Sequence, residues 1–431
     1  MFSAIKSVSL ANKIDICIII SIFLLLICPI IYGLFSKISA NVRQKDIYVS
    51  SRFEEIFGKE ITQTILNDFT EQNPDIRIKL IDAEASGEAD NSKTAKKAPS
   101  IDILIFDEGD YSALASGALL PLAAPDAESE QLAVPLVSFM DLLFYNIELL
   151  DTAGFDRPPK TREEFLSFAK TVSNGEEASG AAMSLSDKDR HAVSRDIFSW
   201  IWAGGGDFWP KENASGDQDE DAVPRPVINT RALVRDISFF GSLYREGSLS
   251  PEVFDTTGEQ RLQEFAQGKI AMIVSSTSAI ASLREKMGDG AFGITVIPGS
   301  GSALRYSVGL SGIYAGINAE CANPEEARIF LDFLAEKSPL LCAELKAVPG
   351  IASDLFSGDY LKDDPLKDDP FYSKARSIFE ASEIVQGFSK TTAAKEFEDA
   401  VRDELRIFFE NTRTPEETAA AIQKRWDEIQ R

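Results

Sequence analysis

The 431-residue chain is acidic, with a formal net charge of −24 at pH 7 and a hydrophobic content of 44%. That length exceeds what one ordinary hydrophobic core needs, so we expect two lobes or domains. A phosphate backbone is bound by a basic surface, so the acidic balance argues against a nucleic-acid-binding protein.

The first feature along the chain is a largely apolar run over residues 16–35. As a helix it would be roughly 30 Å long, which is the thickness of the hydrocarbon core of a membrane. We expect a retained transmembrane helix; a signal peptide cut after Ala40 and a lipoprotein cut before Cys28 are the alternatives. Residues 1–45 are therefore assigned to a membrane anchor or signal and a linker.

Beyond residue 45, strands alternate with helices, which predicts a mostly parallel α/β sheet. The expected strands are 46–50, 76–81 and 101–106, and the expected helices are 54–72 and 111–116. A longer β-type run passes through Pro135 and ends on Tyr145-Asn146. After it, Thr161 and Glu164 have the spacing of a capping box at the start of a helix.

The remainder of the chain is richer in helix. Expected helices are 190–203, 230–246 and 259–267, with strands at 270–275, 292–298 and 311–318 and a helical pattern from Pro324 onward. The helix expected over 324–337 separates Cys321 from Cys342, so we predict two isolated thiols.

Catalytic and metal-binding patterns are missing from the sequence. It contains no CxxC or Cys/His metal spacing, and we predict neither a metal nor a cofactor. His191 is the single histidine, and there is no GxSxG or HExxH motif. We therefore predict a protein that is not an enzyme.

Several short motifs occur in a characteristic order after residue 45. They are Asn73-Pro-Asp-Ile76, Gly117-Ala-Leu-Leu-Pro-Leu122, Leu143-Phe-Tyr-Asn146, Trp202-Ala-Gly-Gly-Gly-Asp207, Phe265-Ala-Gln-Gly-Lys-Ile-Ala-Met272, Phe292–Pro298 and Leu310–Asn318. Each motif is weak alone, but together and in this order they resemble the family 1 extracellular solute-binding proteins, the maltose-binding protein group.

The resemblance implies an α/β fold of the two-lobe, periplasmic-binding-protein-like type (type II), with the ligand in a cleft between the lobes. Lobe one would comprise residues 46–135 and 299–319, and lobe two residues 141–294 and 324–431. Three interlobe crossings would lie near 135–140, 295–300 and 319–323.

The same resemblance implies a substrate-capture protein of an ATP-binding-cassette (ABC) importer. It would pass a small-molecule solute, a carbohydrate or sugar-like compound, to ABC permease subunits. The chain would act as a monomer on the extracytoplasmic, periplasmic side of the cytoplasmic membrane, anchored through residues 16–35. The alternative is a membrane-tethered sensory or structural protein that keeps the scaffold without a transport ligand.

Candidate ligand contacts are residues expected at strand ends, helix starts and crossings that face the cleft. They are Ser50, Arg52, Asp107, Glu108, Phe139, Asp187, Arg190, His191, Ser276, Thr277, Gly309 and Tyr314, with Met140 and Asp141 beside Phe139 at the first crossing. Helix capping, turn geometry and core packing are alternative roles for these residues.

Two positions depart from the sugar-binding pattern of the family. Ser276 stands close to where those proteins commonly carry a tryptophan, and Glu398 aligns with a position at which maltose-binding protein stacks one. Because sugar rings stack on aromatic side chains, these changes weaken a maltodextrin assignment. They indicate a smaller or more polar solute.

Overall fold

The structure is a computed structural model. It describes residues 44–82, 100–115, 117–122, 132–175, 178–189, 192–206, 208, 227–228, 230–299, 306–345, 348–349, 368–385, 393–410 and 412–429. The expected anchor at residues 16–35 lies outside these ranges. Within them, no helix combines the length and the apolar character that spanning a membrane would require.

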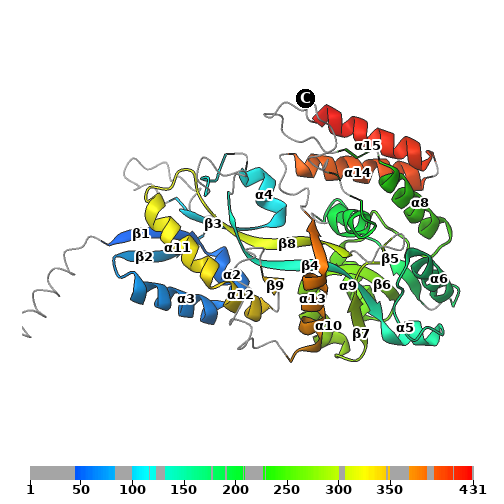
Figure 1. Ribbon diagram of the computed structural model, residues 1–431, viewed down its shortest axis with the longest axis horizontal. Helices are drawn as coiled ribbons and strands as arrows, with labels where there is room; N and C mark the ends of the chain where they lie inside the picture. Colours follow the sequence, from blue (N-terminus) through cyan, green and yellow to red (C-terminus); the bar gives the residue numbers. More distant parts are fainter. Residues whose placement is uncertain are drawn as a thin grey trace, which may run out of the picture.

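A mixed sheet runs along the molecule in the strand order β2-β1-β3-β8-β4-β6-β5 (Figure 1). These strands are β1 (Lys45–Ser50), β2 (Ile76–Ile81), β3 (Ile103–Asp107), β4 (Val134–Asn146), β5 (Ser179–Ala182), β6 (Ile270–Ser276) and β8 (Tyr306–Ile317). Beside this path, β10 (Ser382–Val385) pairs with β8, and β7 (Phe292–Thr295) and β9 (Val348–Pro349) pair with β4.

Strand directions differ between the ends and the centre of the sheet. At the ends, β1 runs parallel to β2 and β3, and β5 runs parallel to β6. At the centre, β4 is antiparallel to β8 and β6, and β8 is antiparallel to β3. The prediction of a mostly parallel sheet is therefore wrong at the centre, because two long strands run in opposite directions between the halves.

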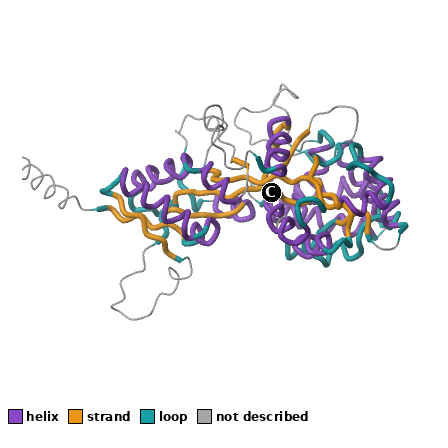
Figure 2. Tube along the Cα trace, turned by 90° about the horizontal axis from the view of Figure 1, so that it is seen from below, coloured by secondary structure: helices purple, strands orange, loops and turns teal. Residues whose placement is uncertain are grey.

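Helices gather at the two ends of the sheet (Figures 1 and 2). Lobe one contains α2 (Arg52–Phe57), α3 (Lys59–Gln72), α4 (Glu108–Ala115), α11 (Pro324–Glu336) and α12 (Ser338–Leu345). Lobe two contains α5 (Ile147–Thr152), α6 (Arg162–Ser173), α7 (Ser199–Ala203), α8 (Arg231–Arg245), α9 (Gly258–Ala266), α10 (Ile280–Met287), α13 (Pro370–Ala381), α14 (Ala394–Phe409) and α15 (Pro415–Ile429). A π-helix, Ser194–Phe198, precedes α7, and a 3₁₀ helix, Thr277–Ala279, precedes α10.

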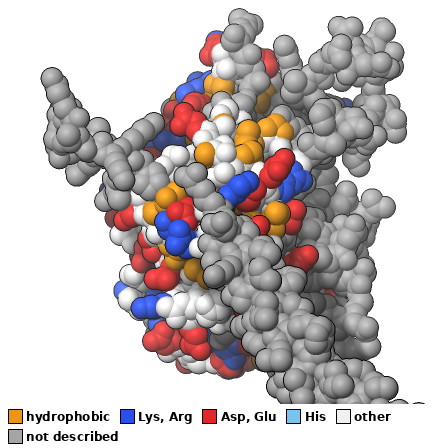
Figure 3. All heavy atoms as spheres, turned by 90° about the vertical axis from the view of Figure 1, so that its left-hand side faces the viewer, with side chains coloured by type: hydrophobic (Ala, Val, Ile, Leu, Met, Phe, Trp, Pro, Cys, Tyr) orange, Lys and Arg blue, Asp and Glu red, His pale blue; other side chains and the backbone are white. Residues whose placement is uncertain are grey.

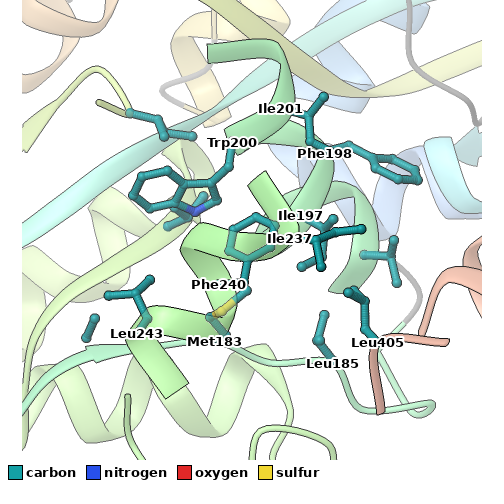
Figure 4. Close-up of a cluster of buried hydrophobic side chains, with 14 of the residues drawn as sticks. Met183, Leu185, Ile197, Phe198, Trp200, Ile201, Ile237, Phe240, Leu243 and Leu405 are labelled. Atoms are coloured by element: carbon teal, nitrogen blue, oxygen red, sulfur yellow. The ribbon is translucent and has the colours of Figure 1, made fainter. Parts of the chain in front are cut away.

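Each lobe buries a core of its own. In lobe one, Ile47 and Ile103 from the strands pack with Phe69 and Phe330 from the helices. In lobe two, the largest apolar cluster joins the π-helix and α7 to α8 and α14, as Figure 4 shows for Ile197, Phe198, Phe240 and Leu405. A second cluster of lobe two packs β6 and β7 against α10 and α13.

Helices α11 and α12 lie in lobe one, which corrects the assignment of everything after residue 324 to lobe two. The Phe330 ring of α11 lies 4.8 Å from that of Phe69, between ring centroids, and Leu341 of α12 is buried in the same core. Helix α11 is amphipathic, and the sheet that it meets directly after β8 is that of lobe one, so its apolar face is buried there. The other predicted lobe boundaries remain predictions.

The predicted crossing at 319–323 is also wrong, because these residues form a turn within lobe one. The backbone amide of Asn318 donates to the backbone carbonyl of Asp102 at 2.8 Å. The backbone amide of Ala319 donates to the backbone carbonyl of Ala118 at 2.9 Å. At α13 the chain belongs to lobe two, since the Phe371 ring stacks on that of Phe292 of β7 with centroids 4.6 Å apart. The segment 135–140 lies within β4, Thr295 is the last residue of β7, and residues 296–299 follow that strand.

Three local predictions have clear outcomes. The helix expected over 54–72 is divided at Gly58, whose φ of 79° separates α2 from α3. The Thr161 hydroxyl caps α6 by accepting from the Glu164 amide at 3.2 Å, but the Glu164 carboxylate accepts from the Lys160 amide instead of closing the box. No disulfide joins Cys321 to Cys342, so both remain thiols as predicted.

Acidic and basic side chains are interspersed over the outer end of lobe one, with short apolar areas between them (Figure 3). At this end Asp46 pairs with Arg77 at 2.7 Å and with Lys79 at 2.6 Å, and Lys337 pairs with Asp68 at 2.6 Å. Exposed pairs of this kind contribute about 0–1 kcal/mol each. The stability of lobe one therefore comes mainly from its apolar core.

Candidate functional site

A cleft of about 480 Å³ lies between the lobes, next to β4 and β8. Asp107 at the end of β3 lines it from lobe one, and Phe139, Asp141 and Gly312 line it from the two long strands. Most of the remaining wall belongs to lobe two. The volume falls within the range of about 300–1,000 Å³ that is typical of small-molecule sites.

A largely buried guanidinium held between two carboxylates forms the centre of the lobe-two wall. Arg195 Nη2 donates to Asp196 Oδ2 at 2.8 Å and to Asp189 Oδ2 at 2.9 Å, and Arg195 Nε donates to Asp196 Oδ2 at 3.2 Å. Backbone amides donate to the same two carboxylate oxygens: that of Ser184 to Asp196 Oδ2 at 3.2 Å and that of Gly258 to Asp189 Oδ2 at 2.9 Å. We call Arg195, Asp189 and Asp196 the buried triad.

The π-helix explains how this charged group reaches the cleft. Ile197 and Phe198 of the same turn point into the apolar core of lobe two (Figure 4). Arg195 and Asp196, directly before them, line the cleft. A π-helical turn inserts one residue into a helix and is frequent at functional sites.

Gly258 allows the start of α9 to approach the buried triad closely. A Cβ atom at this position would lie 2.7 Å from both Arg195 Nη1 and Asp189 Oδ2. Only glycine therefore fits there without displacing one of these two side chains.

Asp141 is a second buried carboxylate in the cleft, located on β4. Burial raises the pKa of Asp141 to about 6, and the charge of Arg195 and the Ser199 hydroxyl oppose that rise only in part. The Ser199 hydroxyl donates to Asp141 Oδ2 at 3.2 Å. Among the described residues, no lysine or arginine lies within ion-pair distance of Asp141.

Burial also shapes the ionisation of the buried triad. It raises the pKa of Asp196, although Arg195 and the Ser184 amide stabilise the carboxylate. Burial disfavours the charged form of Arg195, but Asp196 and Asp189 outweigh it and raise the pKa of the guanidinium. Arg195 therefore remains charged, and the triad carries opposite charges at close range.

Lobe one presents a more exposed cluster of the same residue types. Arg52 Nη2 donates to Asp107 Oδ2 at 2.5 Å, and Arg52 Nη1 donates to Asp110 Oδ2 at 3.1 Å. The Gly109 amide donates to Asp107 Oδ1 at 3.0 Å. We call Arg52, Asp107 and Asp110 the rim triad.

Hydroxyl groups outnumber aromatic rings in the described wall of the cleft. Ser275, Ser276, Ser278 and Ser282 lie together after and around the end of β6, and the Ser278 hydroxyl donates to the Ser276 hydroxyl at 3.0 Å. The aromatic residues of the described wall are Phe139 and Trp202. Within the described ranges, no group of three His, Cys, Asp or Glu side chains is arranged to hold a metal ion.

Four of the predicted contact residues, Asp107, Phe139, Asp141 and Ser276, line the cleft. Arg52 lies behind Asp107 as its ion-pair partner. Ser50 is buried beneath this cluster, and its hydroxyl accepts from the Arg52 amide at 3.3 Å.

Other predicted contacts do not line the cleft. The Thr277 hydroxyl accepts from the Met140 amide at 3.1 Å, and Tyr314 packs against Tyr111 with ring centroids 5.2 Å apart. Gly309 pairs with Val385 in the β8–β10 ladder, and Asp187 is exposed. Arg190 and His191 lie outside the described residues, as does the side chain of Glu108 at the start of α4.

The sequence prediction missed the buried triad and Gly258. A signal for the triad was present: Arg195 and Asp196 are adjacent charged residues in a stretch that otherwise reads as a core helix, between Val193 and Ile197. Burying charges is costly unless they are paired or functional, so such a pair marks a candidate site.

Comparison with known proteins assigns the chain to a family. The sequence model of the bacterial extracellular solute-binding proteins matches residues 50–339, more than half of the chain. The chain belongs to this family. The resemblance predicted from the motifs is thereby confirmed.

Curated relatives of this solute-binding protein match it over about half of their length. An ABC transporter-binding protein of Deinococcus radiodurans is 23% identical over 239 residues, which is 54% of this chain and 54% of the relative. A binding protein of Brucella abortus is 24% identical over 208 residues, which is 47% of this chain and 46% of the relative.

Solved structures match the solute-binding protein over most of its length. Maltose-bound MalE3 of T. maritima superimposes with a TM-score of 0.63 at 20% identity, covering 89% of this chain and 99% of that one. UgpB of Mycobacterium tuberculosis, in complex with glycerophosphocholine, gives 0.65 at 18% identity, with 90% and 98% covered. The cyclic α-maltosyl-1,6-maltose binding protein of Arthrobacter globiformis gives 0.68 at 16% identity, with 90% and 99% covered. At these identities the likeness shows the fold, and it confirms the predicted α/β periplasmic-binding-protein-like class.

Proposed function

We propose that this solute-binding protein captures a small, sugar-like polar solute for an ABC importer by closing its lobes around it. The observation that carries the proposal is the cleft itself, whose wall combines Asp107 of lobe one with Arg195 and Asp196 of lobe two. A solute that bridges the two walls stabilises the closed arrangement over the open one. Capture therefore needs no covalent chemistry, and the protein acts as a binding component and not as an enzyme.

The sugar-like class is supported by the groups that line the cleft. Carboxylates accept hydrogen bonds from ring hydroxyls, and the guanidinium and the serine hydroxyls donate to ring oxygens. Two aromatic residues in the described wall favour a compact solute over a long oligosaccharide that stacks on a series of rings. Structural neighbours include proteins solved with maltose and with glycerophosphocholine.

The finer parts of this proposal concern architecture and location. The fold would be of type II, with the long strands β4 and β8 as two of its three crossings. Residues 16–35 would hold a monomeric solute-binding domain at the outer, periplasmic face of the cytoplasmic membrane, within reach of the permease subunits. The family name, bacterial extracellular solute-binding protein, supports the extracytoplasmic location.

Ligand-induced thermal stabilisation of the full-length protein tests the function. A ligand that binds only the native state at 100 times its Kd contributes about 2.7 kcal/mol and raises the unfolding midpoint. Monosaccharides, disaccharides, polyols and glycerophosphodiesters form the panel, and we expect at least one class to raise the midpoint. Arg195→Ala should abolish that rise, whereas Arg231→Ala, an exposed arginine at the start of α8, should retain it.

If no member of the panel changes the midpoint, the importer function fails and the tethered sensory or structural alternative takes its place. The anchor is tested separately by measuring the mass of the protein extracted from membranes. A mass of 47.3 kDa, that of the full chain, supports retention, and a mass lacking about the first 40 residues contradicts it.

A further inference from the structure

Carboxylates outnumber guanidiniums in the described wall of the cleft. The acidic side chains are Asp107, Asp141, Asp196 and Glu259, and the basic ones are Arg195 and Arg261. An excess of negative charge in a semi-enclosed cleft attracts positive solutes and repels anions.

The basic side chains of this wall are already engaged by the protein. Arg261 Nη1 donates to Glu264 at 2.8 Å and to the Ser250 hydroxyl at 2.7 Å. The charge of Arg195 is shared between Asp189 and Asp196. Neither arginine is therefore a free counter-charge for Asp141.

Asp141 has the properties of a carboxylate that can bind a cationic group of a solute. It is 8% exposed, it lies on β4 between the lobes, and it lines the cleft. The Ser199 hydroxyl occupies Oδ2, whereas Oδ1 has no hydrogen-bond partner among the described residues. A buried carboxylate without an ion pair is costly, and a cation brought by a solute would remove that cost.

Phe139 and Arg195 complete the surroundings of such a solute. Phe139 is two residues from Asp141 on the same strand, so both side chains project from one face, and both line the cleft. Arg195 Nη1 makes no hydrogen bond to any described residue and can donate to a hydroxyl. The arrangement offers a carboxylate for a cation, a ring for an apolar face and donors for hydroxyls.

We propose that the cleft selects a cationic sugar, a small polyhydroxylated ring with a protonated amine, and binds the ammonium group at Asp141. Its hydroxyls contact Arg195 Nη1 and the serines around the end of β6, and its apolar face lies on Phe139. The inference rests on the proposed function and narrows the class of solute. A neutral sugar leaves the charge of Asp141 uncompensated, and a sugar phosphate adds a like charge beside it.

Titration calorimetry of the full-length protein at pH 7.5 tests this selection with matched pairs. Glucosamine, galactosamine and 2-deoxystreptamine are compared with glucose, galactose and myo-inositol, and the N-acetylated amino sugars keep the ring while removing the charge. We expect an amine to bind at least about tenfold more tightly than its neutral partner, a difference of about 1.4 kcal/mol. N-acetylation should remove that preference.

The Asp141→Asn variant should reduce the preference for the amine to about onefold, because it keeps the side-chain shape and removes the charge. Asp151→Asn, an exposed carboxylate on α5, removes the same charge outside the cleft and should keep the preference. Equal binding of amine and neutral partners, or binding of neutral or anionic solutes alone, overturns the inference and leaves the proposed function standing. Absence of binding by every solute in both panels overturns both.

A second measurement requires no ligand. Asp141→Asn should raise the unfolding midpoint of the ligand-free protein at pH 7.5, because the variant removes a buried charge that has no ion-pair partner among the described residues. A lower midpoint would identify Asp141 as a structural group and overturn the inference.

Discussion

The two lobes each bring one arginine between two aspartates to the cleft, but in different surroundings. The exposed fraction of each side chain is 28–37% in the rim triad and 4–15% in the buried triad. Surface ion pairs are screened by water and contribute about 0–1 kcal/mol. Breaking a buried pair costs about 3–5 kcal/mol, because it leaves an uncompensated charge. The same set of one arginine and two aspartates is therefore an adjustable contact on lobe one and a rigid platform on lobe two.

The difference suits a protein that closes on its ligand. Lobe two also supplies Ser184, Gly258 and most of the remaining wall, so it holds the larger part of the preorganised binding surface. Asp107 is the contact that the described part of lobe one adds. A solute would be oriented first on the rigid platform, and the rim triad would adjust to it on closure.

The largest expected effect is that of Arg195→Ala. It removes the guanidinium that Asp189 and Asp196 share, so we expect a loss of about 3–5 kcal/mol in the free energy of unfolding. Urea denaturation followed by circular dichroism measures it, with Arg231→Ala as the exposed control. A loss below about 1 kcal/mol would contradict the rigid role of the buried triad.

The next effect concerns pH and Asp141. Its pKa is about 6 in the folded protein against an ordinary value of 3.8, so the folded state keeps this proton to higher pH than the unfolded state. Stability attributable to this group therefore falls as pH rises from about 4 to about 6, and the cost above that range is on the order of 3 kcal/mol.

Asp141→Asn should remove this part of the pH dependence of the unfolding free energy, and the contributions of other titratable groups should remain. Unfolding free energies of wild type and variant at pH 4, 5, 6 and 7 measure the difference. Parallel curves for the two proteins would show that Asp141 titrates as an ordinary exposed carboxylate.

The smallest effect is expected for Arg52→Ala on lobe one. Because the rim triad is solvated, the free energy of unfolding should fall by at most about 1 kcal/mol. Asp107 loses the partner that positions it, so ligand affinity should weaken by a few-fold, measured by calorimetry. A stability loss as large as that of Arg195→Ala would remove the distinction between the lobes.

Local patterns predicted much of the secondary structure. The strand at 76–81 and the cap at Thr161 depend on residues close in sequence, and both occur where expected. The helix over 54–72 was predicted without its break, because Gly58 is compatible with either a helix interior or a left-handed turn. The choice is made by the packing of α2 and α3.

The site was less predictable, because strand ends and helix starts predict contacts without showing which side chains turn toward the cleft. Asp107 and Ser276 follow that rule and line it, whereas Thr277 turns inward to bind the Met140 amide. Arg195 was missed because helical periodicity places it within a core segment, and the π-helical turn that redirects it depends on packing.

The sequence alone determined the family, the α/β class and the acidic character of the chain, because motif order and composition can be read without knowing which distant residues meet. Tertiary structure decided that α11 and α12 join lobe one and that Arg195 meets Asp189 across a turn. It also decided that Asp141 is buried with no ion pair to any residue that the structure describes. These features depend on which segments, far apart in the sequence, pack together and bury each other's side chains. The sequence of a single segment does not show that packing.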